Sequence, residues 1–139
     1  MAQSITRGIK PMLDEAKKAI EEIEPEDAVK LAGRADVVLV DIRDPRELER
    51  DGKVPGAFHC TRGMLEFWID PDSPYYKPLF GEDKKFVFFC AGGLRSALAA
   101  KTAQDMGLKP VAHILKGFKG WKDAGGPTEA YVAKAKKPA

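Results

Sequence analysis

The chain has 139 residues, of which 44% are hydrophobic and 32% are charged, with 23 basic and 21 acidic side chains. The length fits one globular domain, excludes two full domains in tandem, and allows roughly two-thirds of the unfolded surface to be buried without disulfide or metal staples. The formal net charge of +2 is small and evenly spread, which argues against nucleic acid as a partner because that partner requires a clustered basic stripe.

The cysteines and the charge pattern near the amino terminus bear on location. Cys60 and Cys90 are too few for a disulfide scaffold, which favours a reducing compartment. Charged residues between Arg7 and Lys18 interrupt every apolar run, so no signal peptide is predicted. No other run approaches the roughly 18 apolar residues of a membrane span. We therefore expect a soluble, cytoplasmic protein that does not associate with membranes.

The amino-terminal part of the chain predicts two helices and then a strand. Apolar residues that recur at spacings of three and four predict an amphipathic helix over residues 8–22. A second, short helix is predicted to start with Pro25 in its first turn and to stop at Gly33. The continuous β-branched run at 37–40 is typical of a strand that is buried on both faces of a parallel sheet.

The rest of the chain alternates between strands and helices in the same way. Such alternation indicates an α/β domain with a mainly parallel sheet. The segments that we expect, in chain order, are an extended piece at 54–58, a helix at 63–69, a proline-rich loop at 70–84, a strand at 86–89, a helix that ends at Gly107 and a strand at 111–115.

The segment 86–96 carries the most chemical information. A buried strand leads directly into Cys90, and Gly92 and Gly93 then lead into an alanine-rich helix. Ligands bind at the carboxyl ends of strands in open α/β sheets, and a glycine loop that enters a helix aims several backbone amides at one point. Such a cradle, with Arg95 nearby, would favour a nucleophilic thiolate at Cys90. The alternative is an inert core cysteine, but the loop composition suits an anion cradle better than a packed core.

Four ordered motifs resemble the rhodanese-like family of sulfurtransferases. They are the cysteine loop, the segment VDIRDPRE at 40–47, the segment VPGAFH at 54–59, and the segment LKGFKGW at 115–121 followed by AGGP at 124–127. The resemblance implies a single-domain rhodanese-like α/β fold, with a mainly parallel central sheet flanked by helices and an extra N-terminal helix. It divides the chain into an N-terminal helical extension at 1–22, the rhodanese-like domain at 23–127 and a C-terminal tail at 128–139, whose residues 133–139 we expect to fray into solvent.

The resemblance also implies an activity, which is that of a thiosulfate sulfurtransferase. The Cys90 thiolate would take the outer sulfur of a donor such as thiosulfate, hold it as a persulfide, and pass it to cyanide, a cellular thiol or a protein sulfur carrier. No metal and no dissociable cofactor are implied, and the chain would act as a monomer or homodimer. The residues expected to surround the sulfur and bind the substrate are Ala91, Gly92, Gly93, Leu94, Arg95 and Ser96.

Three residues near the loop each have two interpretations. Arg95 would either hold the anionic donor, which we favour slightly, or act as a structural pin. Ser96 would either cap the helix, which is the simpler role, or donate a hydrogen bond within the loop. Asp41 ends its strand at the same edge as Cys90, so it would either accept hydrogen bonds from the cysteine loop or serve as a turn residue.

The other candidate residues are predicted to support the site structurally. Arg43 and Glu47 are four residues apart, a spacing that allows a salt bridge. His59 is placed near the pocket but is predicted to have no acid–base role. Cys60 would either resolve the persulfide as a disulfide with Cys90 or, as we prefer, remain a buried spectator, and His113 is assigned to packing.

Two other functions fit parts of the sequence. A cysteine-dependent phosphatase or arsenate reductase also uses a thiolate in an amide cradle, but phosphatases place five residues between cysteine and arginine, whereas four separate Cys90 from Arg95. Phe89 also stands where such enzymes usually have histidine. A non-catalytic rhodanese-like binding or regulatory module is the second alternative, and the presence of Cys90 argues against it.

Overall fold

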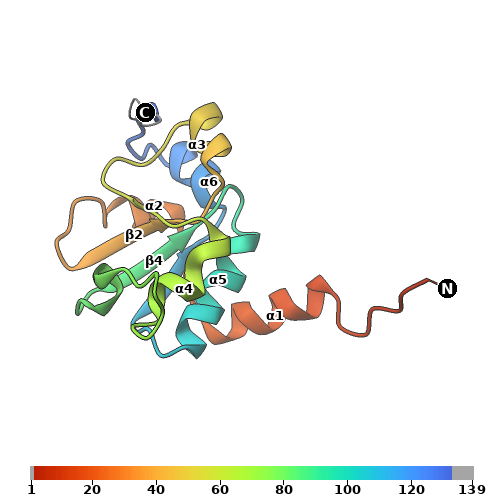
Figure 1. The fold of residues 1–139 in the computed structure, drawn as a ribbon. Coiled ribbons are helices and arrows are strands. Elements are labelled where there is room, and N and C mark those ends of the chain that lie inside the picture. The colour runs from red at the N-terminus through yellow and green to blue at the C-terminus, as the bar shows by residue number, and fades with distance from the viewer. Residues whose placement is uncertain (1, 133–139) are drawn as a thin grey trace, which may run out of the picture.

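The protein is built around one parallel sheet, shown in Figure 1, in a computed structural model that describes residues 2–132. Five strands lie in the order β1-β5-β4-β2-β3, and every neighbouring pair is parallel. The strands are β1 (Glu21–Ile23), β2 (Val37–Asp41), β3 (Phe58–His59), β4 (Lys85–Phe89) and β5 (Val111–Ile114). The predicted α/β class and mainly parallel sheet are confirmed.

Helices cover both faces of this sheet. Helices α1, α4 and α5 pack with one face, and α2 and α6 pack with the other. The helices are α1 (Ile9–Ala19), α2 (Pro25–Val29), α3 (Pro45–Asp51), α4 (Leu65–Ile69), α5 (Leu94–Asp105) and α6 (Gly117–Asp123), with short 3₁₀ turns at η1 (Arg62–Met64) and η2 (Pro78–Gly81).

The central strand β4 is apolar from Phe86 to Phe89 because both faces of the sheet are buried there. In β4, Phe86 and Phe88 join the core under α5, whereas Val87 and Phe89 join the core under α6. All four side chains are fully buried. Successive side chains of a strand point to opposite faces, so a strand covered on both sides needs apolar residues at every position.

The amino-terminal helix is shorter than predicted. Helix α1 ends at Ala19, and the next residues form the edge strand β1, which pairs with β5. Ile20 leaves the helix in an extended conformation while its backbone N–H still bonds to Ala16 O. Pairing with β5 therefore outweighs the helical pattern of residues 21–22, because strand pairing is a tertiary effect that local periodicity does not report. Part of the predicted N-terminal extension thus belongs to the sheet.

The two ends of the domain differ in how they are held. Figure 1 shows that α1 packs against α5. The segment that precedes α1 extends away from the rest of the domain. At the other end, Glu129 forms an antiparallel bridge with Lys53, so the first part of the predicted tail is tied to the domain. The expected fraying at 133–139 concerns residues outside the described range.

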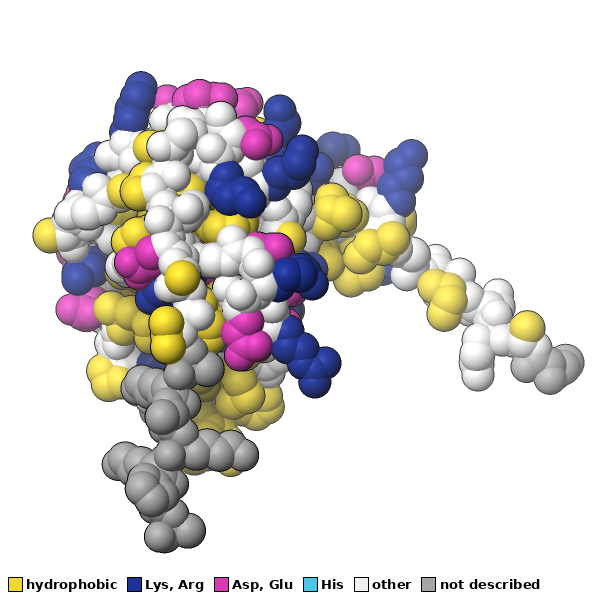
Figure 2. Space-filling model, turned by 90° about the horizontal axis from the view of Figure 1, so that it is seen from above, with side chains coloured by type: hydrophobic (Ala, Val, Ile, Leu, Met, Phe, Trp, Pro, Cys, Tyr) yellow, Lys and Arg dark blue, Asp and Glu magenta, His cyan; other side chains and the backbone are white. Residues whose placement is uncertain are grey.

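The surface carries charges of both signs. On the face in Figure 2, Lys and Arg side chains are interspersed with Asp and Glu, and apolar side chains are visible on the projecting amino-terminal segment. Of the helices formed by residues 2–132, none has the length and apolar character needed to cross a bilayer.

Candidate active site

The parallel sheet brings the candidate residues to one edge. Because all strands run in the same direction, the carboxyl ends of β2 and β4 lie together, and Asp41 and Cys90 are found there. Strand β5 also ends at this edge, and α6 begins just after it at Gly117. Cys90 is 1% exposed, so its sulfur is held within the domain and not on its surface.

The loop after Cys90 forms a cradle for its sulfur. The backbone N–H of Gly93 donates to Cys90 Sγ at 3.1 Å, and that of Ser96 donates at 3.4 Å. Gly93 has a φ of 101°, a left-handed conformation that suits glycine, and α5 begins at the next residue. Two amides and the start of a helix are therefore directed at one sulfur, an arrangement that stabilises negative charge on it.

The first turn of α6 fixes the other side of this loop. The N–H of Phe118 donates to Cys90 O at 2.7 Å, and that of Lys119 donates to Ala91 O at 3.2 Å. Gly117 has a φ of 54°, and a Cβ atom placed there would lie 2.3 Å from Cys90 O. Only glycine allows this approach. Helix α6 was not predicted, because Gly117 and Gly120 lower the helix propensity of a short segment.

Gly117→Ala is expected to displace the cysteine loop. The added methyl group overlaps the Cys90 carbonyl, whereas Gly125→Ala imposes a similar positive φ with no atom near the new methyl group. We expect Gly117→Ala to lose about 1–3 kcal/mol more unfolding free energy than Gly125→Ala and to alter the rate at which Cys90 is alkylated. Urea unfolding and alkylation of the two variants test this, and equal losses would contradict it.

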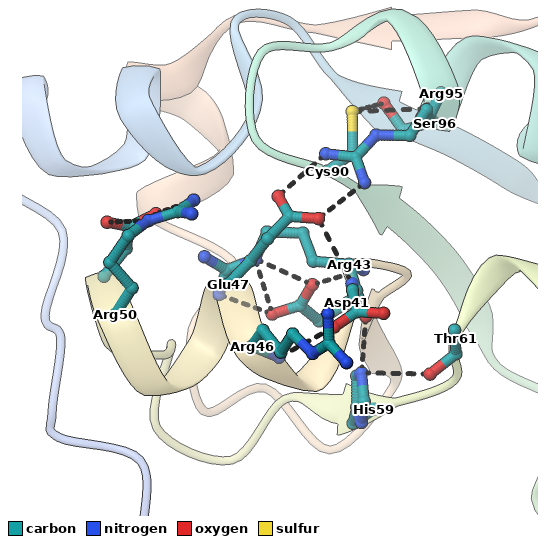
Figure 3. Close-up of polar contacts among 12 residues, drawn as sticks. Asp41, Arg43, Arg46, Glu47, Arg50, His59, Thr61, Cys90, Arg95 and Ser96 are labelled. Atoms are coloured by element: carbon teal, nitrogen blue, oxygen red, sulfur yellow. Dashed lines mark hydrogen bonds and ion pairs between the residues drawn. The ribbon is translucent and has the colours of Figure 1, made fainter.

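Arg95 is held by Glu47 of α3. Its Nη1 and Nη2 donate to Glu47 Oε1 and Oε2 at 2.7 and 2.9 Å, as Figure 3 shows. The hydrogen bond from Arg95 lowers the pKa of Glu47 and raises that of Arg95, so both groups stay charged near neutral pH. This geometry favours the pin over the donor-binding interpretation of Arg95, since the guanidinium ties α5 to α3.

Asp41 and Arg43 form a buried ion pair. Arg43 Nη2 donates to Asp41 Oδ2 at 2.8 Å and to Gly52 O at 2.9 Å, and the Arg43 backbone N–H also donates to Asp41. The Arg43 guanidinium lies 4.1 Å from the centre of the Phe118 ring. Its Nη1 has no hydrogen-bond partner among the described residues. The pair thus links β2 to α6 beneath the cysteine loop.

Two contacts that the sequence allows for these residues do not form. The salt bridge that the spacing of Arg43 and Glu47 allows is absent from the described part of the chain, because α3 starts only at Pro45 and the helical spacing does not reach back to Arg43. Of the two roles considered for Asp41, the structure does not support the one in which it accepts hydrogen bonds from the cysteine loop. Asp41 accepts hydrogen bonds from Arg43, and none from the described cysteine loop.

His59 and Cys60 lie on the β3 side of the site. His59 Nε2 is 2.6 Å from Arg43 O, which ties β3 to the turn after β2. Cys60 is fully buried and unbridged, and burial raises the pKa of its thiol to about 12. A thiol of that kind stays protonated at neutral pH, which suits a spectator and not a resolving cysteine.

Ser96 does not cap α5. The N-cap is Gly93, and the Ser96 side chain instead points inward, with its Oγ 3.6 Å from Cys90 Sγ and 2.9 Å from His113 Nδ1. His113 Nε2 is 2.9 Å from Glu22 Oε2. His113 was assigned to packing and Glu22 to a helix. The signal in the sequence that could have revealed this contact is His113 itself, a lone polar residue inside the apolar run 111–115.

The chain is similar to rhodanese-like proteins over most of its length. The model of the rhodanese-like domain family matches residues 24–124. Thiosulfate sulfurtransferase GlpE of Actinobacillus succinogenes is 31% identical over 120 residues, which cover 84% of this chain and 97% of GlpE. Thiosulfate sulfurtransferase/rhodanese-like domain-containing protein 3 of Mus musculus is 27% identical, and the match covers 66% of this chain but only 61% of the mouse protein.

One solved structure has a higher sequence identity to this chain than these relatives do. It is a protein of unknown function from Rhodopseudomonas palustris, described as a possible tyrosine phosphatase. It is 74% identical to this chain, and the match covers 93% of this chain and 99% of that one with a TM-score of 0.90.

Proposed function

Because this chain belongs to the rhodanese-like domain family, we propose that it moves a sulfane sulfur from an anionic donor such as thiosulfate to a thiophilic acceptor through a persulfide on Cys90. Distant thiosulfate sulfurtransferases are among its relatives. The observation that carries the proposal is the pair of backbone amides, from Gly93 and Ser96, directed at one buried sulfur. They suit the thiolate that attacks the donor and the persulfide anion that forms in the first step.

The proposed reaction has two half-reactions. The Cys90 thiolate attacks the outer sulfur of thiosulfate, a bond forms between the two sulfurs, and the electron pair of the donor's S–S bond leaves on sulfite. The acceptor, which is cyanide, a cellular thiol or a protein sulfur carrier, then attacks the outer sulfur of the persulfide and releases the Cys90 thiolate. Since cysteine is both nucleophile and carrier, the proposed steps require no metal and no dissociable cofactor.

The surroundings of the loop suit an anionic donor. A depression of about 260 Å³ lies beside the loop, and Ala91, Lys119 and Lys122 are among its lining residues. Lys119 and Lys122 outnumber Asp51, the one carboxylate in this lining, so the depression favours small anions. The low exposure of Cys90 in turn shields a bound persulfide from bulk water.

Phosphoester hydrolysis is the second candidate function, because the 74% identical protein is described as a possible tyrosine phosphatase. A cysteine phosphatase holds the phosphate oxygens with a loop arginine directed into the cradle. Here Arg95 donates both terminal nitrogens to Glu47, and four residues separate it from Cys90. This geometry favours sulfur transfer over phosphate binding.

Both activities can be measured on one preparation. We expect the wild-type protein to form thiocyanate from thiosulfate and cyanide, and to hydrolyse p-nitrophenyl phosphate no faster than a Cys90→Ser variant does. Cysteine-dependent phosphate release without thiocyanate formation would replace the proposal with the phosphatase. Neither activity, with mercaptopyruvate and persulfidated cysteine desulfurase also failing as donors, would instead favour a binding module.

A further inference from the structure

A chain of polar side chains leads away from Cys90 through the core. Ser96 Oγ lies 3.6 Å from Cys90 Sγ, His113 Nδ1 lies 2.9 Å from Ser96 Oγ, and Glu22 Oε2 lies 2.9 Å from His113 Nε2. Ser96 and His113 are fully buried, and the Glu22 side chain is 28% exposed. Cys90 directly follows β4, and Ser96, His113 and Glu22 come from α5, β5 and β1, so a continuous path joins the reactive sulfur to the edge of the sheet.

The hydrogen bonds along this path can all run in one direction. The Cys90 thiol donates to Ser96 Oγ, the Ser96 hydroxyl donates to His113 Nδ1, and His113 Nε2–H donates to the Glu22 carboxylate. In this arrangement each donor has one acceptor, and the neutral imidazole carries its proton on Nε2. A base whose Nδ1 lone pair accepts from Ser96 therefore lies one hydroxyl group away from the reactive thiol.

The charged groups that face His113 are Glu22 on β1 and Lys17 on α1. Burial lowers the pKa of His113, Lys17 lowers it further, and Glu22 raises it by hydrogen bonding and charge. Because burial dominates, His113 is neutral near pH 7, and burial opposes its protonation. The Glu22 carboxylate stabilises the imidazolium that would result.

We propose that Ser96, His113 and Glu22 form a proton relay that takes the thiol proton of Cys90 and returns it at the end of the catalytic cycle. The inference rests on the proposed function. As the S–H bond breaks, its proton passes to Ser96 Oγ while the Ser96 proton passes to His113 Nδ1. The products are the Cys90 thiolate, an intact serine and an imidazolium paired with Glu22. No electrons are exchanged, and the proton returns along the same path when the thiolate is released.

His113 and Glu22 act through Ser96 and are therefore positioning residues. Their role is tested by following the ultraviolet absorbance of the Cys90 thiolate against pH, with the signal of Cys90→Ser protein subtracted. We expect Glu22→Gln to move the midpoint of thiolate formation upward by about one pH unit, which is a tenfold smaller thiolate fraction below the midpoint. Glu21→Gln removes the neighbouring carboxylate, which pairs with Lys85, and should titrate as wild type.

A double variant separates a relay from a merely structural contact. If the effect travels through the serine hydroxyl, Glu22→Gln should have no further effect on the titration once Ser96→Ala is present. A shift that persists in the Ser96→Ala background, or a wild-type titration of Glu22→Gln, would overturn the relay.

This test is independent of sulfur transfer. Sulfur uptake at Cys90 together with a wild-type titration of Glu22→Gln would overturn the relay and leave the proposed function standing. A shifted midpoint that is lost with Ser96→Ala, in a protein that takes up no sulfur from any donor, would support the relay and overturn the proposed function.

Discussion

A Cys90→Ser protein is expected to lose at least about 10³-fold in thiocyanate formation from thiosulfate and cyanide, while keeping its fold. The hydroxyl group of serine neither ionises near neutral pH nor forms a persulfide, so both half-reactions lose their nucleophile and carrier. The two cradle amides have no thiolate to stabilise in that variant. The measurement is the steady-state rate under identical conditions for both proteins.

The second cysteine supplies the matched control. Cys60 is buried in the same core and burial raises the pKa of its thiol to about 12, so it contributes no nucleophile. Cys60→Ala should therefore keep its rate within about threefold of wild type after correction for any unfolded fraction. Loss of activity in Cys60→Ala, with Cys90→Ser still active, would show that Cys60 and not Cys90 is the nucleophile.

Asp41→Ala is expected to lower the unfolding free energy by about 3–5 kcal/mol. The substitution leaves the fully buried Arg43 guanidinium without its carboxylate, and Arg43 Nη1 has no hydrogen-bond partner among the described residues even in the wild type. An uncompensated buried cation is among the most costly defects that a single change produces. Urea unfolding at neutral pH measures the loss.

Two further variants serve as controls for the stability loss of Asp41→Ala. Asp36→Ala removes the carboxylate of the exposed Arg34–Asp36 pair and should cost less than about 1 kcal/mol, because water screens such pairs. Asp41→Asn keeps one oxygen acceptor for Arg43 without the charge, so its loss should fall between the two. Equal losses for Asp36→Ala and Asp41→Ala would show that the buried pair contributes no more than a surface pair.

The fold could be predicted largely from local patterns. Largely apolar runs mark β2, β4 and β5, because a strand buried on both faces needs apolar residues at most positions. The position of Cys90 directly after such a run was enough to place it at the carboxyl edge of the sheet. The glycine pair that follows it marked the tight turn into α5.

The features that were missed depend on contacts between distant segments. Strand β1 forms only because β5 offers it an edge, and its three residues carry too little pattern to be seen alone. The partner of Arg95 lies 48 residues away at Glu47, and that of His113 lies 91 residues away at Glu22. Spacing rules within one helix do not reach such pairs, which is why the role of Arg95 and the path through Ser96 needed the structure.

The central claim is that Cys90 carries a persulfide, and mass spectrometry tests it most directly. Reduced wild-type protein is incubated with thiosulfate, its intact mass is measured, and the peptide that contains Cys90 is identified before and after treatment with a reductant. We predict one added sulfur atom, located on Cys90 and removed by the reductant. An unchanged mass with thiosulfate and with the other sulfur donors, or a sulfur atom located on Cys60, would contradict the claim.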